Sequence, residues 1–344
     1  MSVSSPFRQL FLSWLRQFHR EPEAVFWVYV FPLLMIVGLG LAFKGGDDSV
    51  ARVRVIAADA EAGERLAAAL EEAGAFEVVL GSSQDEVRAG GQELTVLLDE
   101  DGVEYRVDPT QAESLLAREW VDRILQEGAG RIDPLRAEVQ EVTAPGSRYI
   151  DWVIPGLLGL NIMGSSMWGV GFSAVDLRIR KVLKRLRATP MRRMDFLGSL
   201  ITSRVIFLAL EVALILAFGR ILFGMPIVGG PLSIAVICIL GAAAFASLSL
   251  LVGSRASKIE TISGWMNAVQ VPMWLLSGVF FSWERFPESL QPLIRALPLT
   301  QLNNALRAVI LEGAPLWGEW PELVGLSLWS VASFGLAMRF FRWQ

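Results

Sequence analysis

Basic side chains are concentrated between Asp176 and Asp195, in the segment DLRIRKVLKRLRATPMRRMD, where eight Lys/Arg are opposed by only two aspartates. Arginine forms paired hydrogen bonds with carboxylates, so such a segment can bind an acidic surface of another protein. Its basic residues are Arg178, Arg180, Lys181, Lys184, Arg185, Arg187, Arg192 and Arg193. Because it lies between two long apolar stretches, we expect a cytoplasmic loop that fixes the orientation of the chain in a membrane.

The polar side chains inside the apolar stretches include Asn161, Glu211, Asn267 and Gln270. A carboxylate in hydrocarbon is unfavourable unless it is paired or hydrated. Glu211 is therefore either a functional group or a structural partner of a neighbouring helix. Asn161 can likewise form a hydrogen bond across helices or line a path. We take these four residues as candidates for a substrate path.

Other kinds of chemistry find little support. The single cysteine, Cys238, rules out an intrachain disulfide and a multi-cysteine metal site. The single histidine, His19, is expected to lie at the membrane interface. No G-x-x-x-x-G-K-[ST] phosphate loop occurs, and the acidic residues at 99–104 lack the spacing of a calcium loop. We expect no catalytic residue, no metal site and no cofactor bound by this chain.

The apolar stretches that position these residues occur in blocks. Hydrophobic residues make up 53% of the chain and charged residues only 19%, whereas about a quarter of a soluble domain is charged. This balance indicates a membrane protein, in which ~20 apolar residues cross ~30 Å of hydrocarbon. Six segments qualify as spans: 24–43, 150–175, 197–223, 232–252, 261–283 and 321–338.

Residues 6–20 precede the first span and have the periodicity of an amphipathic helix. Its apolar face carries Phe7, Leu10, Phe11, Trp14, Leu15 and Phe18. Basic residues lie away from this face, and a helix of this kind is suited to lying in the membrane interface. Pro32, within the first span, is expected to kink that helix.

Residues 47–148 differ in composition, with 23 Asp/Glu against 10 Lys/Arg. Short β-like runs alternate with helical runs, and Asp101-Gly102 between two β-like runs predicts a hairpin. The β-like runs are Val53–Ala57, Leu94–Leu98 and Val103–Val107, and the helical runs are Glu61–Glu72 and Ala112–Gln126. This segment is expected to be a small α/β domain.

The charges agree with one topology. Six spans place both termini on one side, and the segments expected on that side are basic. We therefore expect an α-helical polytopic membrane protein with six transmembrane helices, an N-terminal interfacial helix and an inserted small α/β extracytoplasmic domain. Its parts are an interfacial helix (1–22), the first transmembrane helix (23–44), the α/β domain (45–148), and helices 2–6 (149–344) with the 176–195 loop. Residues 284–315 are expected to form external interfacial helices or part of a re-entrant segment. Within them, an apolar stripe is formed by Leu302, Ala305, Leu306, Val309 and Ile310, and the polar residues expected away from it are Asn303, Asn304, Arg307 and Glu312.

Two local patterns resemble those of a known family, the ATP-binding-cassette type-2 permeases, which are the membrane subunits of type V exporters. Leu183-Lys-Arg-Leu-Arg-Ala-Thr-Pro190 with Arg192-Arg193 resembles the family's L-x-R-L-x-A-T-P-x-x-R segment. The second pattern comprises Pro272–Gly278, Phe286-Pro287, Gln291-Pro292, Leu297–Thr300 and Ala305–Arg307. The layout of nearly the whole chain also matches, with one span, a large external domain and then five further spans.

The resemblance implies an exporter permease without its own ATP site. Its partners would be ATP-binding-cassette ATPase subunits, which bind ATP and Mg, and a second permease copy, identical or paralogous. A periplasmic adaptor is left open, and no nucleic acid is expected. The ATPase-coupling loop would contain a docking helix at Arg178–Lys184 and a turn at Leu186–Arg193. Arg185 lies between these two parts, and Arg187, Thr189 and Pro190 lie within the turn. The expected location is the bacterial plasma (inner) membrane, with both termini cytoplasmic and residues 45–148 extracytoplasmic.

The residues alone leave alternatives open. The basic loop can be a topology signal without a partner. The chain can also be a membrane-anchored sensor or scaffold, with 47–148 as the sensing module. An intramembrane enzyme finds less support, because Glu211 has no obvious acidic or basic partner at depth. Spans rich in Met and Trp suit a hydrophobic or amphipathic cargo, such as a drug, a lipid or a lipid-linked product, although packing accounts for such residues equally simply.

Overall fold

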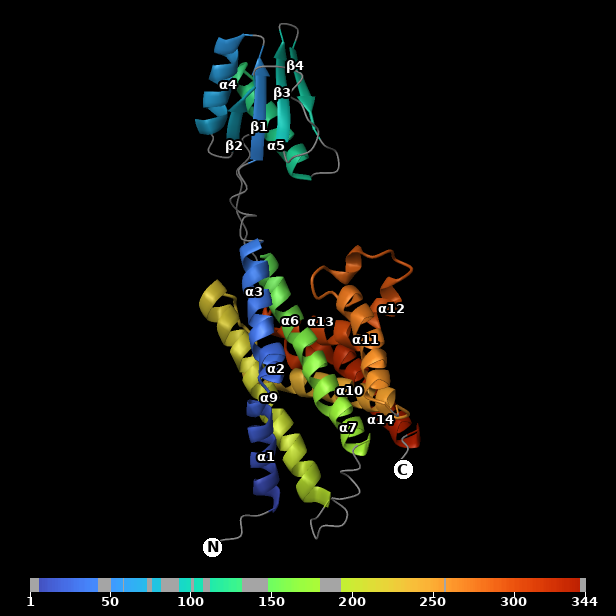
Figure 1. Ribbon diagram of the computed structural model, residues 1–344. Helices are drawn as coiled ribbons and strands as arrows, with labels where there is room; N and C mark the ends of the chain where they lie inside the picture. The colour runs from blue at the N-terminus through green and yellow to red at the C-terminus, as the bar shows by residue number, and fades with distance from the viewer. Residues whose placement is uncertain are drawn as a thin grey trace. The chain divides into compact units, whose positions relative to one another are not determined.

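The computed structural model describes residues 6–42, 51–57, 59–72, 76–81, 93–99, 102–107, 112–131, 148–179, 193–256 and 258–340. The chain divides into two compact units (Figure 1). One unit, here called the membrane body, comprises Met1–Phe43 and Thr143–Gln344, and the other, here called the α/β unit, comprises Lys44–Val142.

The α/β unit is built on a four-stranded sheet in the order β2-β1-β3-β4. β1 pairs in parallel with β2 and β3, and β3 pairs antiparallel with β4, so the predicted hairpin is present. The elements are β1 (Ala51–Ala57), α4 (Ala60–Glu72), β2 (Phe76–Leu80), β3 (Glu93–Asp99), β4 (Gly102–Arg106) and α5 (Ala112–Gly128). Its core joins Val53 and Val96 of the sheet to Leu70 of α4 and Val121 of α5.

A phenol links the hairpin of the α/β unit to a helix. The Tyr105 hydroxyl donates a hydrogen bond to Asp122 of α5, with an Oη–Oδ1 distance of 2.9 Å. Burial and this hydrogen bond raise the pKa of Tyr105 to about 12. The protonated phenol is therefore favoured in the folded unit, so its contribution to folding is present below pH 10 and is lost as the pH rises toward 12.

We predict that the Tyr105→Phe chain loses less stability at alkaline pH than the wild type does. The measurement is the unfolding midpoint of the full chain between neutral pH and pH 12, followed by circular dichroism in the region of the β signal. The wild type should lose stability above pH 10 more steeply than the variant, because only the wild type must ionise this phenol. Parallel curves for the two proteins would contradict the prediction.

The described residues of the membrane body form helices joined by short non-helical connections (Figure 1). Its first part consists of α1 (Pro6–Arg20), α2 (Pro22–Val25), η1 (Phe26–Val30) and α3 (Phe31–Ala42). Its middle part consists of α6 (Tyr149–Ser166), η4 (Met167–Phe172), α7 (Ser173–Ile179), α9 (Arg193–Phe223) and α10 (Pro231–Gly253). Its last part consists of α11 (Ile259–Leu276), η5 (Trp283–Arg285), α12 (Gln291–Arg295), α13 (Pro298–Ile310), η6 (Leu316–Glu319) and α14 (Trp320–Phe340). Here η1 and η4 are π-helical, and η5 and η6 are 3₁₀ turns.

Five helical stretches within the described ranges are long and apolar enough to cross a membrane, which defines a polytopic helical membrane protein. They are Pro22–Ala42, Tyr149–Leu177, Gly198–Phe223, Pro231–Gly253 and Leu316–Phe340. The predicted span 261–283 is shorter in the structure, because α11 ends at Leu276 and Gly278 adopts a φ of 70°. Its 18 residues measure about 27 Å at a rise of 1.5 Å per residue.

α13 is buried among α6, α10 and α14 (Figure 1), and a helix lying on an interface would keep one face open. Of the two arrangements expected for this stretch, a buried position fits a re-entrant segment better. The predicted stripe of Leu302, Leu306 and Ile310 is fully buried. The expectation that Asn303 and Arg307 face away from the core is wrong, because both side chains are buried and donate hydrogen bonds to backbone carbonyls.

α1 matches the predicted helix 6–20, and its apolar stripe is half-buried while the basic residues are exposed. The stripe packs along the first half of α9. The rings of Phe18 and Phe207 lie 4.3 Å apart, and the Tyr29 hydroxyl donates to the Phe207 carbonyl over 3.4 Å. α1 is thereby placed beside the beginning of the first span, where it contributes to the cavity described next.

Candidate functional site

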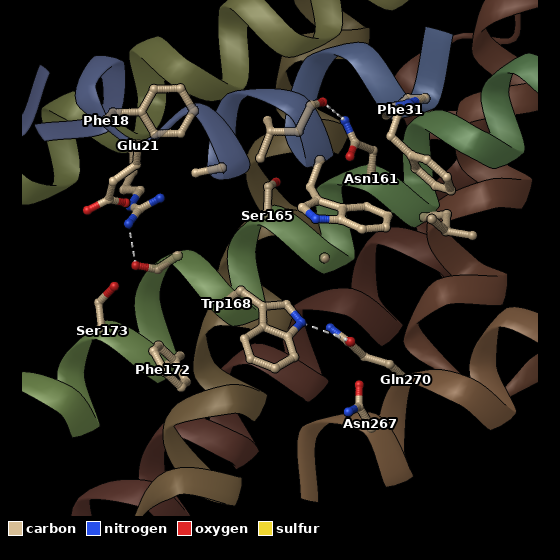
Figure 2. A pocket seen from close by; sticks show the side chains of 18 of the residues that line it. Phe18, Glu21, Phe31, Asn161, Ser165, Trp168, Phe172, Ser173, Asn267 and Gln270 are labelled. Carbon is tan, nitrogen blue, oxygen red and sulfur yellow. Dashed lines mark hydrogen bonds between the residues drawn. The ribbon is translucent and has the colours of Figure 1, made fainter. Parts of the chain in front are cut away.

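The membrane body contains a cavity of about 1110 Å³, at the upper end of the sizes usual for small-molecule sites. Its walls come from α1–α3, from the continuous α6–η4–α7 helix and from α11, with Arg204 of α9 at one side. Three of the four polar residues predicted from the sequence, Asn161, Asn267 and Gln270, line this cavity (Figure 2).

One helix forms the length of the cavity. Its lining residues on α6–η4–α7 begin at Leu157, end at Leu177 and recur every three or four positions, as one face of a helix does. At 1.5 Å per residue this stretch is ~30 Å long, close to the ~30 Å thickness of the hydrocarbon layer. The cavity therefore follows a spanning helix over most of a membrane thickness.

The walls of the cavity are mainly aromatic, and its charges are confined to one end. The aromatic lining residues are Trp14, Phe18, Trp27, Phe31, Trp168, Phe172, Trp274 and Phe280. The charged lining residues are Glu21, which directly follows α1, Asp176 of α7 and Arg204 of α9. A site with broad apolar walls and polar groups at one end suits an amphipathic ligand.

Polar contacts fix the orientation of side chains in the cavity (Figure 2). The Trp168 indole donates to Gln270 Oε1 over 3.1 Å, and Gln270 Nε2 lies 3.5 Å from Met167 Sδ. These contacts hold the Trp168 ring across the gap between η4 and α11. Asn161 Nδ2 donates to the Val28 carbonyl over 2.8 Å. Asn267 is exposed to the cavity from α11.

The fourth predicted residue, Glu211, does not line this cavity. It is 1% exposed on α9 and lies beside Ser165, which does line the cavity and whose hydroxyl donates to the Ile162 carbonyl over 3.4 Å. Its Oε1 has no hydrogen-bond partner among the described residues. Glu211 is therefore buried next to a residue of the cavity wall and is not itself part of that wall.

The predicted coupling residues lie largely outside the described residues. α7 extends to Ile179, so the backbone of Arg178 belongs to its last turn. Residues 180–192 are not described; they include Arg180, Lys181, Lys184, Arg185, Arg187, Thr189 and Pro190. The role assigned to this loop stays a prediction.

Sequence reasoning missed the contribution of Arg204 and most of the aromatic wall. The guanidinium of Arg204 donates a hydrogen bond to the Gly169 carbonyl of η4. A charged residue near the end of an apolar span was the signal that could have identified it. Among the Met and Trp residues of the spans, Trp168 and Trp274 line the cavity, whereas Trp265 on the same helix as Trp274 is 60% exposed and does not. Within the described ranges, no cluster of three or more His, Cys, Asp or Glu could hold a metal ion.

Several apolar helices long enough to cross a membrane, with an elongated cavity along one of them, are typical of a multi-pass membrane protein. Residues 110–311, more than half of the chain, match the family model described as ABC-2 type transporter. The chain belongs to this family and is a membrane subunit of the ABC-2 type. Its family lacks an ATPase site of its own.

Three relatives share part of the chain. "Putative transport permease YvfS" of Bacillus subtilis is 25% identical over 158 residues, which is 46% of this chain and 64% of the relative. "ABC transporter G family member 20" of Dictyostelium discoideum is 26% identical over 175 residues, which is 50% of this chain and 24% of the relative. "Nodulation protein J" of Rhizobium meliloti is 31% identical over 99 residues, which is 29% of this chain and 37% of the relative. The matched part is less than two thirds of the length of each relative.

Proposed function

We propose that this chain is the permease subunit of an ATP-binding-cassette exporter that moves a hydrophobic or amphipathic substrate out of the cytoplasm or the inner leaflet. The cavity carries this proposal, because its aromatic walls follow a spanning helix while its charged groups gather at one end. Asn161, Asn267 and Gln270 would offer hydrogen bonds to the passing substrate. Glu211 would act on the path through Ser165.

The proposed topology has six spans, with α11 as the fifth, although it is short, and with α13 as a re-entrant helix beside it. Both termini would lie in the cytoplasm of a bacterial cell, in its inner membrane. The α/β unit would be extracytoplasmic. The distribution of charge along the sequence supports this orientation, since the segments assigned to the cytoplasm are basic and residues 47–148 are acidic.

The energy would come from separate ATPase subunits that bind ATP and Mg, and no cofactor would be bound by this chain. Two permease copies, identical or paralogous, would each contact one ATPase through the basic loop at 176–195. Arginine-rich loops suit this contact, because the guanidinium group binds carboxylates in a fixed geometry. Closure of the ATPase dimer would then move α7, which continues directly into η4 and the cavity wall.

We predict that replacing Arg178, Arg180, Lys181 and Lys184 together by glutamine abolishes stimulation of the partner ATPase. The measurement is ATP hydrolysis and copurification of the complex in lipid, with an ATP-binding-cassette ATPase subunit coexpressed with this chain. A matched control replaces Arg255 and Lys258, which belong to another loop expected on the same side. Equal stimulation by the wild type and the loop variant would leave the loop as a topology signal only.

The sensor or scaffold alternative predicts a different outcome in the same system. Removing residues 47–142 would abolish the function of a sensor, whereas a permease that lacks this unit would still copurify with its ATPase and stimulate it. The aromatic cavity favours the permease, because a membrane anchor does not need a cavity of this length.

A further inference from the structure

Two of the helical stretches that line the cavity, α2–η1–α3 and α6–η4–α7, contain a π-helical segment at the cavity. η1 contributes Trp27 and Val28 to the lining, and η4 contributes Trp168, Gly169 and Phe172. A π-helical segment accommodates one extra residue in an α-helix, and such segments are frequent at functional sites. The extra residue disturbs the i→i−4 hydrogen bonds, so a carbonyl oxygen needs another donor.

In η1 the sequence shows directly which carbonyl loses its regular α-helical donor. The Val28 carbonyl would normally accept from the N–H of residue 32, but residue 32 is proline and has no N–H. Asn161 of α6 supplies the missing donor, with an Nδ2–O distance of 2.8 Å (Figure 2). Asn161 is buried, and its amide takes the place of the backbone N–H that Pro32 lacks.

In η4 the carbonyl that loses its regular α-helical donor belongs to Gly169. Its regular partner would be the N–H of Ser173, but that N–H bonds to the Val170 carbonyl instead. The guanidinium of Arg204, from α9, donates to the Gly169 carbonyl. A Cβ added to Gly169 would clash with the Arg204 guanidinium, so a larger residue here would displace Arg204 from this contact.

A simple ion pair does not account for the position of Arg204. Among the described residues no carboxylate forms a salt bridge with Arg204. Glu21 interacts with it electrostatically, but not as a contact ion pair. A buried cation is costly unless its hydrogen bonds compensate for the lost hydration. The contact with Gly169 is the hydrogen bond that the structure gives it.

We infer that Arg204 and Asn161 are positioning residues that hold the two π-helical segments in register and thereby direct Trp168 and Trp27 into the cavity. One residue corresponds to about 100° of rotation in a helix with 3.6 residues per turn. If η4 lost its π-helical turn without losing a residue, α7 would rotate by about this angle. Ser173 and Asp176 would then leave the cavity wall that they now form.

This inference predicts suppression of an Arg204 variant by a deletion. Deleting Val170 removes the extra residue of η4, so the flanking helices stay in phase and no carbonyl requires Arg204. Arg204→Leu alone should turn Ser173 away, whereas Arg204→Leu combined with the Val170 deletion should not. A purely structural role for Arg204 elsewhere would not be relieved by this deletion.

The test uses the purified full chain in lipid, with Cys238→Ser to remove the only native thiol and Ser173→Cys as the reporter. The probe is a methanethiosulfonate reagent carrying a trimethylammonium group, and the observable is its rate of reaction with the reporter thiol. We expect Arg204→Leu to lower this rate at least tenfold, Arg204→Lys to keep most of it, and the Val170 deletion to restore it in the Arg204→Leu chain. Arg220→Leu is the control, because Arg220 donates to Met225 beyond the end of its own helix.

The outcomes distinguish the possibilities. If Arg204→Leu fails to fold, recovery of folded protein on deleting Val170 supports the inference as well as recovery of the labelling rate does. If the deletion restores neither, or if Arg204→Leu reacts like the wild type, the role of Arg204 is overturned. No ATPase or cargo is needed, so the result does not depend on the proposed transport function.

The η1 segment allows an independent test on the same principle. Asn161→Leu should lower the midpoint of thermal unfolding by several degrees, because the Val28 carbonyl loses its donor in a buried site. Pro32→Ala supplies the missing N–H, so Asn161→Leu should have little effect in a Pro32→Ala chain. Equal shifts in the two backgrounds would show that Asn161 does not act through the Val28 carbonyl.

Discussion

Arg307→Met is expected to lower the free energy of unfolding of the membrane body by about 2–4 kcal/mol, because two buried backbone carbonyls lose their donor. Arg307 is 4% exposed on α13. Its Nε donates to the Trp152 carbonyl over 3.1 Å, and its Nη2 donates to the Gly278 carbonyl. The guanidinium also lies 3.6 Å from the centre of the Trp152 ring.

These contacts join three elements at the end of the cavity. Trp152 belongs to the first turn of α6, Gly278 follows the end of α11, and Arg307 comes from α13. Asn303, one turn away, donates to the Ser277 carbonyl over 3.1 Å. The side chains of α13 thus cap the end of α11, whose last carbonyls lack partners within the helix.

Arg307→Lys should recover little of this stability, because an ammonium group cannot reach two carbonyls in a fixed plane or stack on the Trp152 ring. Arg295→Met is the matched control, since Arg295 is exposed on α12 and should change stability by less than about 0.5 kcal/mol. The measurement is the unfolding midpoint in detergent for the three variants. An Arg307→Met chain as stable as the Arg295→Met chain would show that the buried charge costs as much as its hydrogen bonds contribute.

The spans were predictable where a long apolar run decides the structure. The segment predicted at 197–223 corresponds to the helical stretch Gly198–Phe223, since no polar alternative exists for a backbone in such a sequence. The end of α11 was not predictable, because apolar residues continue past Gly278 while the backbone turns away. That turn is stabilised by Asn303 and Arg307, which lie far away in sequence.

In the α/β unit, strand β2 was missed, although β1, β3 and β4 were predicted. Phe76–Leu80 is a short run that follows a helix, and periodicity alone does not separate such a run from a loop. Its identity as a strand depends on parallel pairing with β1, which is a contact between distant segments. Pairing of this kind has no local signature in the sequence.

The site shows the same division between local and distant causes. Asn161, Asn267 and Gln270 were recognisable because polar residues in spans are unfavourable without a partner, and the structure places all three at one cavity. Pro32 also signalled a free carbonyl one turn earlier in its helix. The π-helical turn at η4 had no such signal, because it depends on the approach of Arg204 from another helix.

Two glycines on the α6–η4 helix are expected to separate folding from function. Gly171 is buried against α10, where an added Cβ would lie 2.8 Å from the backbone carbonyl carbon of Ser249 and closer to its side chain. Gly164 lines the cavity, and nothing lies within 4 Å of an added Cβ. The same helix therefore offers one position where a side chain must separate two helices and one where it extends into open space.

Gly171→Leu should lower the free energy of unfolding by about 1–3 kcal/mol or more, because the overpacked side chain separates η4 from α10. Gly164→Trp should leave stability unchanged or slightly higher, since glycine is unfavourable in a helix by about 1 kcal/mol. It should nevertheless fill part of the cavity and weaken ligand binding at least tenfold, which corresponds to about 1.4 kcal/mol. The stabilities follow from thermal unfolding of the purified chains.

Ligand binding is measured with N-phenyl-1-naphthylamine, an apolar fluorescent probe whose emission rises in a dry site. Gly335→Trp is the control for an added indole, because an added Cβ at this position in α14 also meets nothing within 4 Å and the residue does not line the cavity. The control should bind the probe like the wild type, and Gly164→Trp should not. If Gly164→Trp instead unfolds while Gly171→Leu is tolerated, the packing assigned to the two faces of this helix is reversed. If Gly164→Trp folds and binds the probe normally, the cavity along α6 is not the site that takes up apolar molecules.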